Sequence, residues 1–167
     1  FVTAAGPRFV EINSDAPGTV QNEVRIARNA TDLNNFAVAH NDAIGLSASP
    51  LGVSFSLDGG ATWTDRQLSI PKHPVMGVPD DNLPFPSIFD PFIDSDGAGN
   101  IYAGYIATAG QPGPGGLYIE RSTDKGNSWS GPTTIAFNVR ATGPADLTYR
   151  FNARPDMTVD SANNALV

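Results

Sequence analysis

One eight-residue pattern occurs twice in this chain and limits its fold more than any other feature. Residues 56–63 (SLDGGATW) and 122–129 (STDKGNSW) share the form Ser-x-Asp-x-Gly-x-(Thr/Ser)-Trp, and the two copies begin 66 residues apart. A motif that returns at such a period indicates an array of similar supersecondary units. The chain is therefore expected to be built from repeated units and not from one irregular core.

The residue types in the pattern favour a tight turn. An Asp in a turn accepts hydrogen bonds from backbone N–H groups further along, and a Gly two positions later takes a positive φ without steric cost. The Ser or Thr hydroxyl adds a local bond, and the Trp can fold back beneath the loop and bury apolar area. Each copy is expected to be a structural hairpin turn. Its defining residues are Ser56, Asp58, Gly60 and Trp63 in the first copy and Ser122, Asp124, Gly126 and Trp129 in the second.

The pattern resembles the Asp-box, or bacterial neuraminidase repeat, of sialidase-like β-propellers. In that family the box lies on a β-turn at the blade periphery, away from the active-site mouth. The resemblance therefore implies a fold and not a chemistry. The expected class is all-β, with blades of four antiparallel strands that form part of a ring of six or more blades.

A second repeat lies upstream of each box and sets the boundaries of the units. Residues 90–102 are echoed by 154–167, with Pro91 matching Pro155, and a looser copy at 23–39 places Val24 on Pro91. The predicted organisation is a lead-in over 1–19, a first blade over 20–70, a connection over 71–86, a second blade over 87–137, a connection over 138–152 and the start of a third blade over 153–167. Strands are expected near 23–28, 36–40, 51–56 and 62–68, and near 90–94, 100–107, 116–122 and 128–136.

Two and a half blades cannot close a ring. Even four blades of this period need ~264 residues, and propellers have about four to eight blades. We expect the missing blades to come from the same polypeptide, with blades from other chains as the alternative, because repeat units need neighbours to bury their faces.

The two connections are candidate ligand-binding loops. The prolines of residues 71–86 are expected to prevent regular structure there, and residues 138–152 carry side chains suited to sugars or carboxylates. The favoured interpretation is nevertheless that both segments cross between blades and pack on a neighbouring sheet. The polar residues of the second connection are Arg140, Asp146, Tyr149 and Arg150.

Composition narrows the classes of partner. A net charge of −7 disfavours binding to a phosphate backbone, so no nucleic-acid partner is expected. The absence of Cys excludes a disulfide scaffold and a thiolate site, and no apolar run reaches the ~20 residues of a membrane span. The family resemblance implies an extracellular or cell-surface location and a glycan or glycoprotein partner.

Residues 94–100 (DSDGAGN) give a metal hypothesis. Closely spaced carboxylates before a Gly can direct oxygens at Ca²⁺, with Asp94 and Asp96 as the ligands. The segment lacks the distal bidentate Glu of a full calcium loop, so a plain hairpin turn without any cofactor is the favoured interpretation.

Catalytic residues are suggested only by the resemblance. Sialidases bind the substrate carboxylate with three arginines, attack with a Tyr paired to a Glu and protonate the leaving group with an Asp. The resemblance implies Arg25, in 24–27 (VRIA), as the first arginine and Asp42 as the acid, although the flanking aromatic residue and Pro of the family motif are absent. The favoured interpretation is that Arg25 and Arg28 are outward-facing strand residues and Asp42 is a turn residue.

Three functions remain open from the sequence. The favoured one is a propeller that binds glycans or proteins without catalysis, because the testable catalytic positions depart from the family motif. The alternatives are a sialidase-type glycoside hydrolase acting at the propeller mouth and a structural component of an extracellular assembly.

Overall fold

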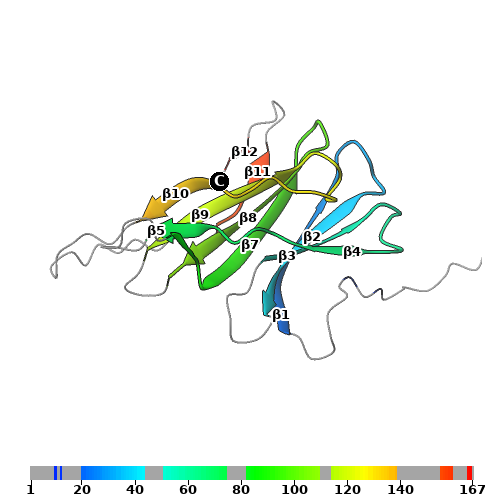
Figure 1. Ribbon diagram of the computed structural model, residues 1–167. Coiled ribbons are helices and arrows are strands. Elements are labelled where there is room, and N and C mark those ends of the chain that lie inside the picture. Colours follow the sequence, from blue (N-terminus) through cyan, green and yellow to red (C-terminus); the bar gives the residue numbers. More distant parts are fainter. Residues whose placement is uncertain are drawn as a thin grey trace, which may run out of the picture.

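The computed structural model describes residues 10, 12, 20–43, 51–74, 82–109, 114–138, 155–159 and 165–166, and all regular structure in them is β (Figure 1). The all-β prediction is confirmed. The strands are β1 Val20–Arg28, β2 Phe36–Ala43, β3 Leu51–Ser56, β4 Thr64–Gln67, β5 Lys72–Pro74, β6 Asn82–Pro84, β7 Ser87–Ser95, β8 Ile101–Thr108, β9 Gly115–Ser122, β10 Thr133–Asn138, β11 Thr158–Val159 and β12 Ala165–Leu166.

Two four-stranded antiparallel sheets form the body of the molecule and lie side by side (Figure 1). The first sheet has the order β1-β2-β3-β4, and the second has the order β7-β8-β9-β10. Each strand pairs with its neighbour in sequence, so each sheet is a simple meander. The two sheets correspond to the first and second predicted units, and β1 packs against β7.

The core lies between the two sheets. Side chains alternate along β8, so that Ala103 and Tyr105 face the first sheet while Ile106 faces Met157 beside β11. The second sheet is therefore covered on both faces. The main cluster contains Ala39, Leu51, Val53, Leu68, Phe85, Ile88, Ala103, Tyr105, Ala107 and Tyr118.

The connection between the sheets contains structure that the sequence analysis did not expect. β5 and β6 pair antiparallel, with Lys72 opposite Pro84 and Pro74 opposite Asn82, so the prediction that prolines prevent regular structure over 71–86 is wrong. Pro74 and Pro84 each stand at the end of a strand, where a missing N–H is tolerated. The ring of His73 also packs on Phe85, with centroids 4.7 Å apart.

The last strand of the second sheet begins later than expected, at Thr133 and not near residue 128. Ser128 and Trp129 complete the preceding turn, and Ser130 donates its N–H to the carbonyl of Arg121. These bonds use the backbone that a longer strand would need. Most of the lead-in 1–19 and of the connection 138–152 lies outside the described residues, and of the third unit only the short β11–β12 pair and its approach are described.

The two turns that carry the repeated pattern have the same hydrogen bonds. In the first, Asp58 accepts from the N–H and the hydroxyl of Thr62, at 2.8 and 2.7 Å, and Ser56 Oγ accepts from the N–H of Gly60 at 2.8 Å. Together with the Ser56 hydroxyl, the Thr62 bonds hold the pKa of Asp58 at about 2. The second turn repeats the set through Ser122, Asp124, Gly126, Ser128 and Trp129.

The loop between β1 and β2 connects the two sheets at one end of their strands. Asn35 is fully buried and donates from Nδ2 to the carbonyls of Ser56, at 2.9 Å, and Lys125, at 3.0 Å. Its Oδ1 accepts from Nδ2 of Asn29, which also donates to the carbonyl of Gly99. One loop of the first sheet thus holds two turns of the second.

Substituting Asn35 by alanine should lower the free energy of unfolding by about 2 kcal/mol, because it leaves buried carbonyls and an amide without partners. Urea denaturation followed by tryptophan fluorescence measures this. The matched control is Lys125→Ala, which removes only the exposed 2.7 Å ion pair to Asp32 and should cost less than ~1 kcal/mol. Equal losses for the two variants would contradict a structural role for the Asn35 side chain.

Candidate functional site

The first strands of the two sheets share an irregularity at the same position. In β1 the register shifts between Asn22 and Arg25, and in β7 it shifts between Phe89 and Phe92. Each strand carries one extra residue there, which makes a β-bulge. Bulges of this kind are frequent beside active sites, where they redirect side chains.

Both bulges hold an acidic residue in a backbone conformation that favours glycine. Glu23 has φ 55° and Asp90 has φ 53°. A non-Gly residue in this region costs on the order of 1–3 kcal/mol, and such residues concentrate at functional sites. Because glycine would relieve the strain, we interpret the retention of an acid in both units as a sign that the side chains are used.

A cavity of about 240 Å³ lies at these bulges. It is lined by Glu23, Arg25, Asp90, Pro91 and Pro155, so the first, second and third units all contribute to it. Glu23 Oε2 accepts from Nδ2 of Asn41 at 2.8 Å and from the N–H of Asp90 at 3.1 Å. The Glu23 carboxylate therefore joins the two bulges. We call this the bulge cavity.

The structure separates the two catalytic candidates. Arg25 is exposed, lines the bulge cavity and pairs with Ala39, whose side chain is in the core facing the second sheet. Asp42 is three residues further along β2, so its side chain lies on the opposite face. There it is buried and accepts from Nε2 of Gln67 at 3.1 Å. Arg25 and Asp42 therefore do not share one site.

A buried tyrosine–glutamate pair lies between the sheets. Tyr105 Oη is 2.9 Å from Glu120 Oε1 and 3.0 Å from the carbonyl oxygen of Ser69. Burial raises the pKa of Glu120 to about 7, against hydrogen bonds from Tyr105 and the Ser69 backbone that lower it, and burial also raises the pKa of Tyr105. With both side chains at most 1% exposed, the pair is inaccessible to a substrate.

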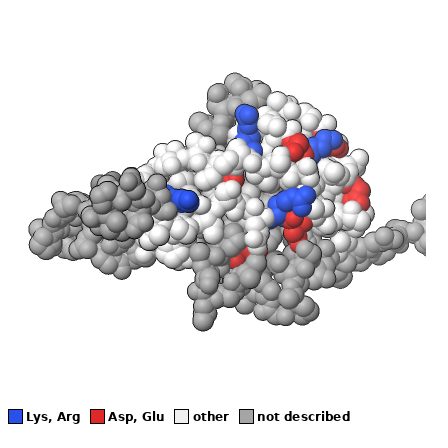
Figure 2. Space-filling view, in the orientation of Figure 1, with Lys and Arg blue, Asp and Glu red and all other residues white. Residues whose placement is uncertain are grey.

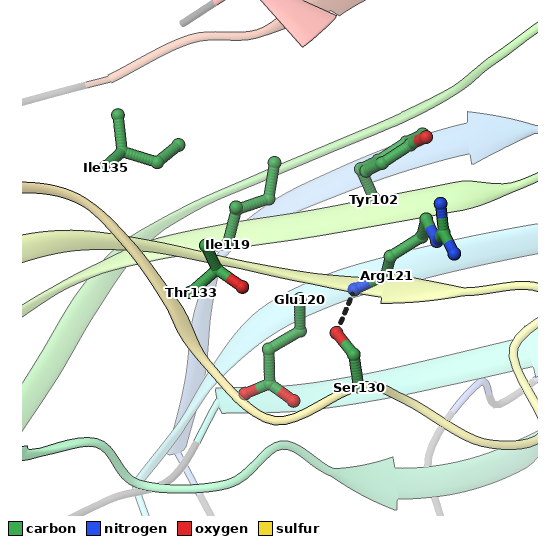
Figure 3. Close-up of a pocket in the computed structure, with 7 residues that line it drawn as sticks. All are labelled: Tyr102, Ile119, Glu120, Arg121, Ser130, Thr133 and Ile135. Carbon is green, nitrogen blue, oxygen red and sulfur yellow. Dashed lines mark hydrogen bonds between the residues drawn. The ribbon is translucent and has the colours of Figure 1, made fainter.

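A second hollow, of about 520 Å³, lies along the second sheet. Its lining residues are Tyr102, Ile119, Glu120, Arg121, Ser130, Thr133 and Ile135. In the close-up, Ile119 and Glu120 point to opposite sides of β9 (Figure 3). Tyr102 and Ile119 belong with Met157 to the cluster on the second sheet's far face. This hollow therefore extends the surface that receives the third unit.

The predicted calcium ligands point to different places. Asp96 accepts from the N–H groups of Ala98 and Asn100 and from the hydroxyl of Tyr102, so its carboxylate closes its own turn. Asp94 accepts from the N–H of Val159 in β11, at 3.1 Å. Among the described residues, no group of three or more His, Asp or Glu side chains is placed to hold a metal ion. Calcium binding stays a prediction.

The fold has known counterparts. The chain superimposes on a Hadza microbial sialidase with a TM-score of 0.55 and 21% identity, over 69% of this chain and 26% of that one. It also matches a protein of unknown function from Dyadobacter fermentans, with a TM-score of 0.52 and 17% identity, over 88% of this chain and 45% of that one. The described sheets have a sialidase-like β-propeller fold. No protein-family model and no curated protein matches the sequence.

The sialidase-like fold gives the bulge cavity a place in the molecule. The chain spans about a quarter of the length of the sialidase and under half of the Dyadobacter protein. Blades of a propeller surround a central channel. The edge strands β1 and β7 contact each other, and the bulge cavity lies where these two blade edges meet.

The described surface carries no broad basic area on the face shown in Figure 2, where Lys and Arg side chains are scattered among acidic ones. Lys125 forms an ion pair with Asp32. The expectation of no nucleic-acid partner stays a prediction. Among the described residues no helix is long and apolar enough to cross a membrane.

Sequence reasoning missed Glu23, Asp90 and the Tyr105–Glu120 pair. A signal for the first two was present, because placing Val24 on Pro91 also places Glu23 on Asp90, two acids at one repeat position. A weaker signal existed for the burial of Glu120. It lies two residues after Tyr118 in a largely apolar strand, so both side chains point to the same face, and that face is in the core.

Proposed function

We propose that this chain is part of a β-propeller that binds glycans at the mouth of its central channel. The observation that carries the proposal is the bulge cavity, where Arg25, Glu23 and Asp90 meet between the edges of two blades. Sugar recognition needs fixed donors and acceptors around a small concave site. Arg25 offers up to five N–H donors, and the two carboxylates are acceptors.

A sialidase-type hydrolase is the second candidate, and Arg25 favours it because the resemblance implies this residue as the first carboxylate-binding arginine. Asp42 lies on the opposite face of the blade from Arg25, which disfavours its role as the acid that protonates the leaving group. The Tyr105–Glu120 pair is not a candidate for the Tyr–Glu pair that the resemblance implies, since it is buried between the blades. Turnover of a fluorogenic sialoside by the purified protein would favour the hydrolase.

We also propose an extracellular or cell-surface location, on the resemblance of the two turns to Asp-boxes. Calcium binding by Asp94 and Asp96 belongs to the same proposal. A structural role in an extracellular assembly is the third candidate, and it differs from glycan binding in needing no cavity at the channel.

Substituting Arg25 by alanine should weaken glycan binding about 10–100-fold, because a hydrogen bond from a charged donor contributes ~1.5–3 kcal/mol. A glycan array followed by calorimetry on the best ligand measures this. Arg28→Ala is the matched control, since Arg28 is an exposed arginine of the same strand that does not line the cavity. Equal binding by R25A and the unsubstituted protein would contradict the placement of the site.

A further inference from the structure

The bulge of β7 has a backbone conformation that its own sequence disfavours. The register of β7 shifts between Phe89 and Phe92, so Asp90 and Pro91 fall outside the regular pairing with β8. A residue before proline prefers an extended backbone, yet Asp90 has φ 53°. A positive φ costs a non-Gly residue on the order of 1–2 kcal/mol. A contact from outside the strand is therefore expected to hold Asp90 in place.

Such a contact comes from the neighbouring blade. Glu23 Oε2 accepts a hydrogen bond from the N–H of Asp90 at 3.1 Å. Pro91 has no N–H, so this bond uses the one main-chain donor that the two bulged residues of β7 possess. A hydrogen bond to a carboxylate is roughly twice as strong as one between neutral groups. The Glu23 carboxylate therefore stabilises the bulge of the next blade in its positive-φ form.

The Glu23 carboxylate is itself held by its own blade. Glu23 is exposed, and ordering a long side chain of this kind costs ~1.5–2 kcal/mol of rotamer freedom. Asn41 of β2 is half-buried and donates from Nδ2 to Glu23 Oε2 at 2.8 Å and to Asn22 Oδ1 at 2.7 Å. Asn41 is not among the described residues that line the bulge cavity. An effect of Asn41 on a bound ligand would therefore pass through Glu23.

We infer that Glu23 is a positioning residue of the bulge cavity. Its carboxylate, held by Asn41, fixes the bulge of β7 and so determines where Asp90 and Pro91 stand relative to Arg25. The inference rests on the proposed glycan binding and adds to it the group that aligns the edges of two blades at the site.

Amide hydrogen exchange of Asp90, followed by nuclear magnetic resonance on the whole chain, tests the bond between the blades. Exchange should be about 10-fold faster in Glu23→Ala and in Asn41→Ala than in the unsubstituted protein, because the N–H loses a charged acceptor or an acceptor that is held in place. Glu23→Gln keeps an acceptor oxygen and should restore most of the protection. Other amides of β7 and β8 should exchange as before. Unchanged exchange of Asp90 in both alanine variants would overturn the inference.

Ligand affinity tests the positioning itself, with the best ligand from the glycan array. Asn41→Ala should weaken binding about 10-fold through the displaced bulge. The matched control is Asn22→Ala, which removes the other acceptor of Asn41 and should bind normally. Melting temperatures report whether each variant folds. If Asn41→Ala does not fold, Glu23→Gln should bind more tightly than Glu23→Ala, and equal losses in these two would overturn the inference.

The outcomes separate the inference from the proposed function. If the unsubstituted protein binds glycans and a folded Asn41→Ala binds them as tightly, the positioning role of Glu23 is overturned and glycan binding stands. If the unsubstituted protein binds no glycan, the proposed function fails and the positioning role fails with it. Faster exchange of the Asp90 amide together with weaker binding in Asn41→Ala supports both.

Discussion

Substituting Gly126 by alanine should destabilise the fold by roughly 2–5 kcal/mol. Gly126 has φ +99°, which costs an L-residue ~1–2 kcal/mol. A Cβ there would also lie 2.8 Å from Cβ of Phe55, in the neighbouring blade. Overpacking of this kind adds ~1–3 kcal/mol.

Gly60 provides the matched control, because it occupies the same position in the first turn. Its φ is +88°, but a Cβ there would meet only Trp63, at 3.7 Å. Gly60→Ala should therefore cost the backbone part alone, ~1–2 kcal/mol. Urea denaturation gives the free energy of unfolding of both variants. The difference between the two losses measures the contact of the second turn with Phe55. Equal costs would show that this contact between blades is not tight in solution.

Substituting Glu120 by glutamine should remove a pH dependence of stability. The pKa of Glu120 is raised to about 7 in the folded chain from 4.5, so the folded state binds more protons than the unfolded state between these values. Stability from this group is fully present below about pH 4.5 and is lost as the pH rises through about 7. At ~1.4 kcal/mol per pKa unit, the loss is up to about 3 kcal/mol.

The main physical cause is burial, which disfavours the charged form of the Glu120 carboxyl and raises its pKa against the hydrogen bonds from Tyr105 and the Ser69 backbone. Tyr105 Oη has one hydrogen and lies near two acceptors, Glu120 Oε1 and the Ser69 carbonyl. A neutral group at position 120 can donate to Tyr105 and free its hydrogen for Ser69. The E120Q variant should therefore be more stable than the unsubstituted protein at pH 8 but not at pH 5. Denaturation midpoints at four pH values test this, with the exposed Glu23→Gln as control, and parallel profiles would refute it.

The turns and the strand order were accessible from the sequence because local chemistry determines them. Asp58 and Asp124 accept from residues four positions on, and Gly60 and Gly126 take a positive φ within the same turn. All of the information lies within eight consecutive residues. The period of the repeat then divided the chain into units, and the first two correspond to the two four-stranded sheets.

The candidate site was less accessible because it depends on contacts between distant segments. Glu23 lies against Asp90 only after two bulges shift the register of their strands, and Tyr105 meets Ser69 across the blade interface. The positions of the two prolines in the β5–β6 hairpin also depend on pairing that no local rule reveals. The prediction for Asp42 used only its neighbours in the sequence. It did not take into account the alternation of side chains along β2, which puts Asp42 on the face opposite Arg25.

Several of the bonds that join the two blades are accepted by main-chain carbonyls. Asn35 donates from Nδ2 to the carbonyl of Lys125, and Asn29 donates from Nδ2 to that of Gly99. Ser95 donates its hydroxyl to the carbonyl of Arg28. A carbonyl is present whatever side chain its residue carries. Each such hydrogen bond therefore depends on the side chain of the donor only. The positive φ of Gly99 and Lys125 restricts replacement at those two positions, whereas a change of the Arg28 side chain leaves the bond from Ser95, and with it that link between neighbouring blades, in place.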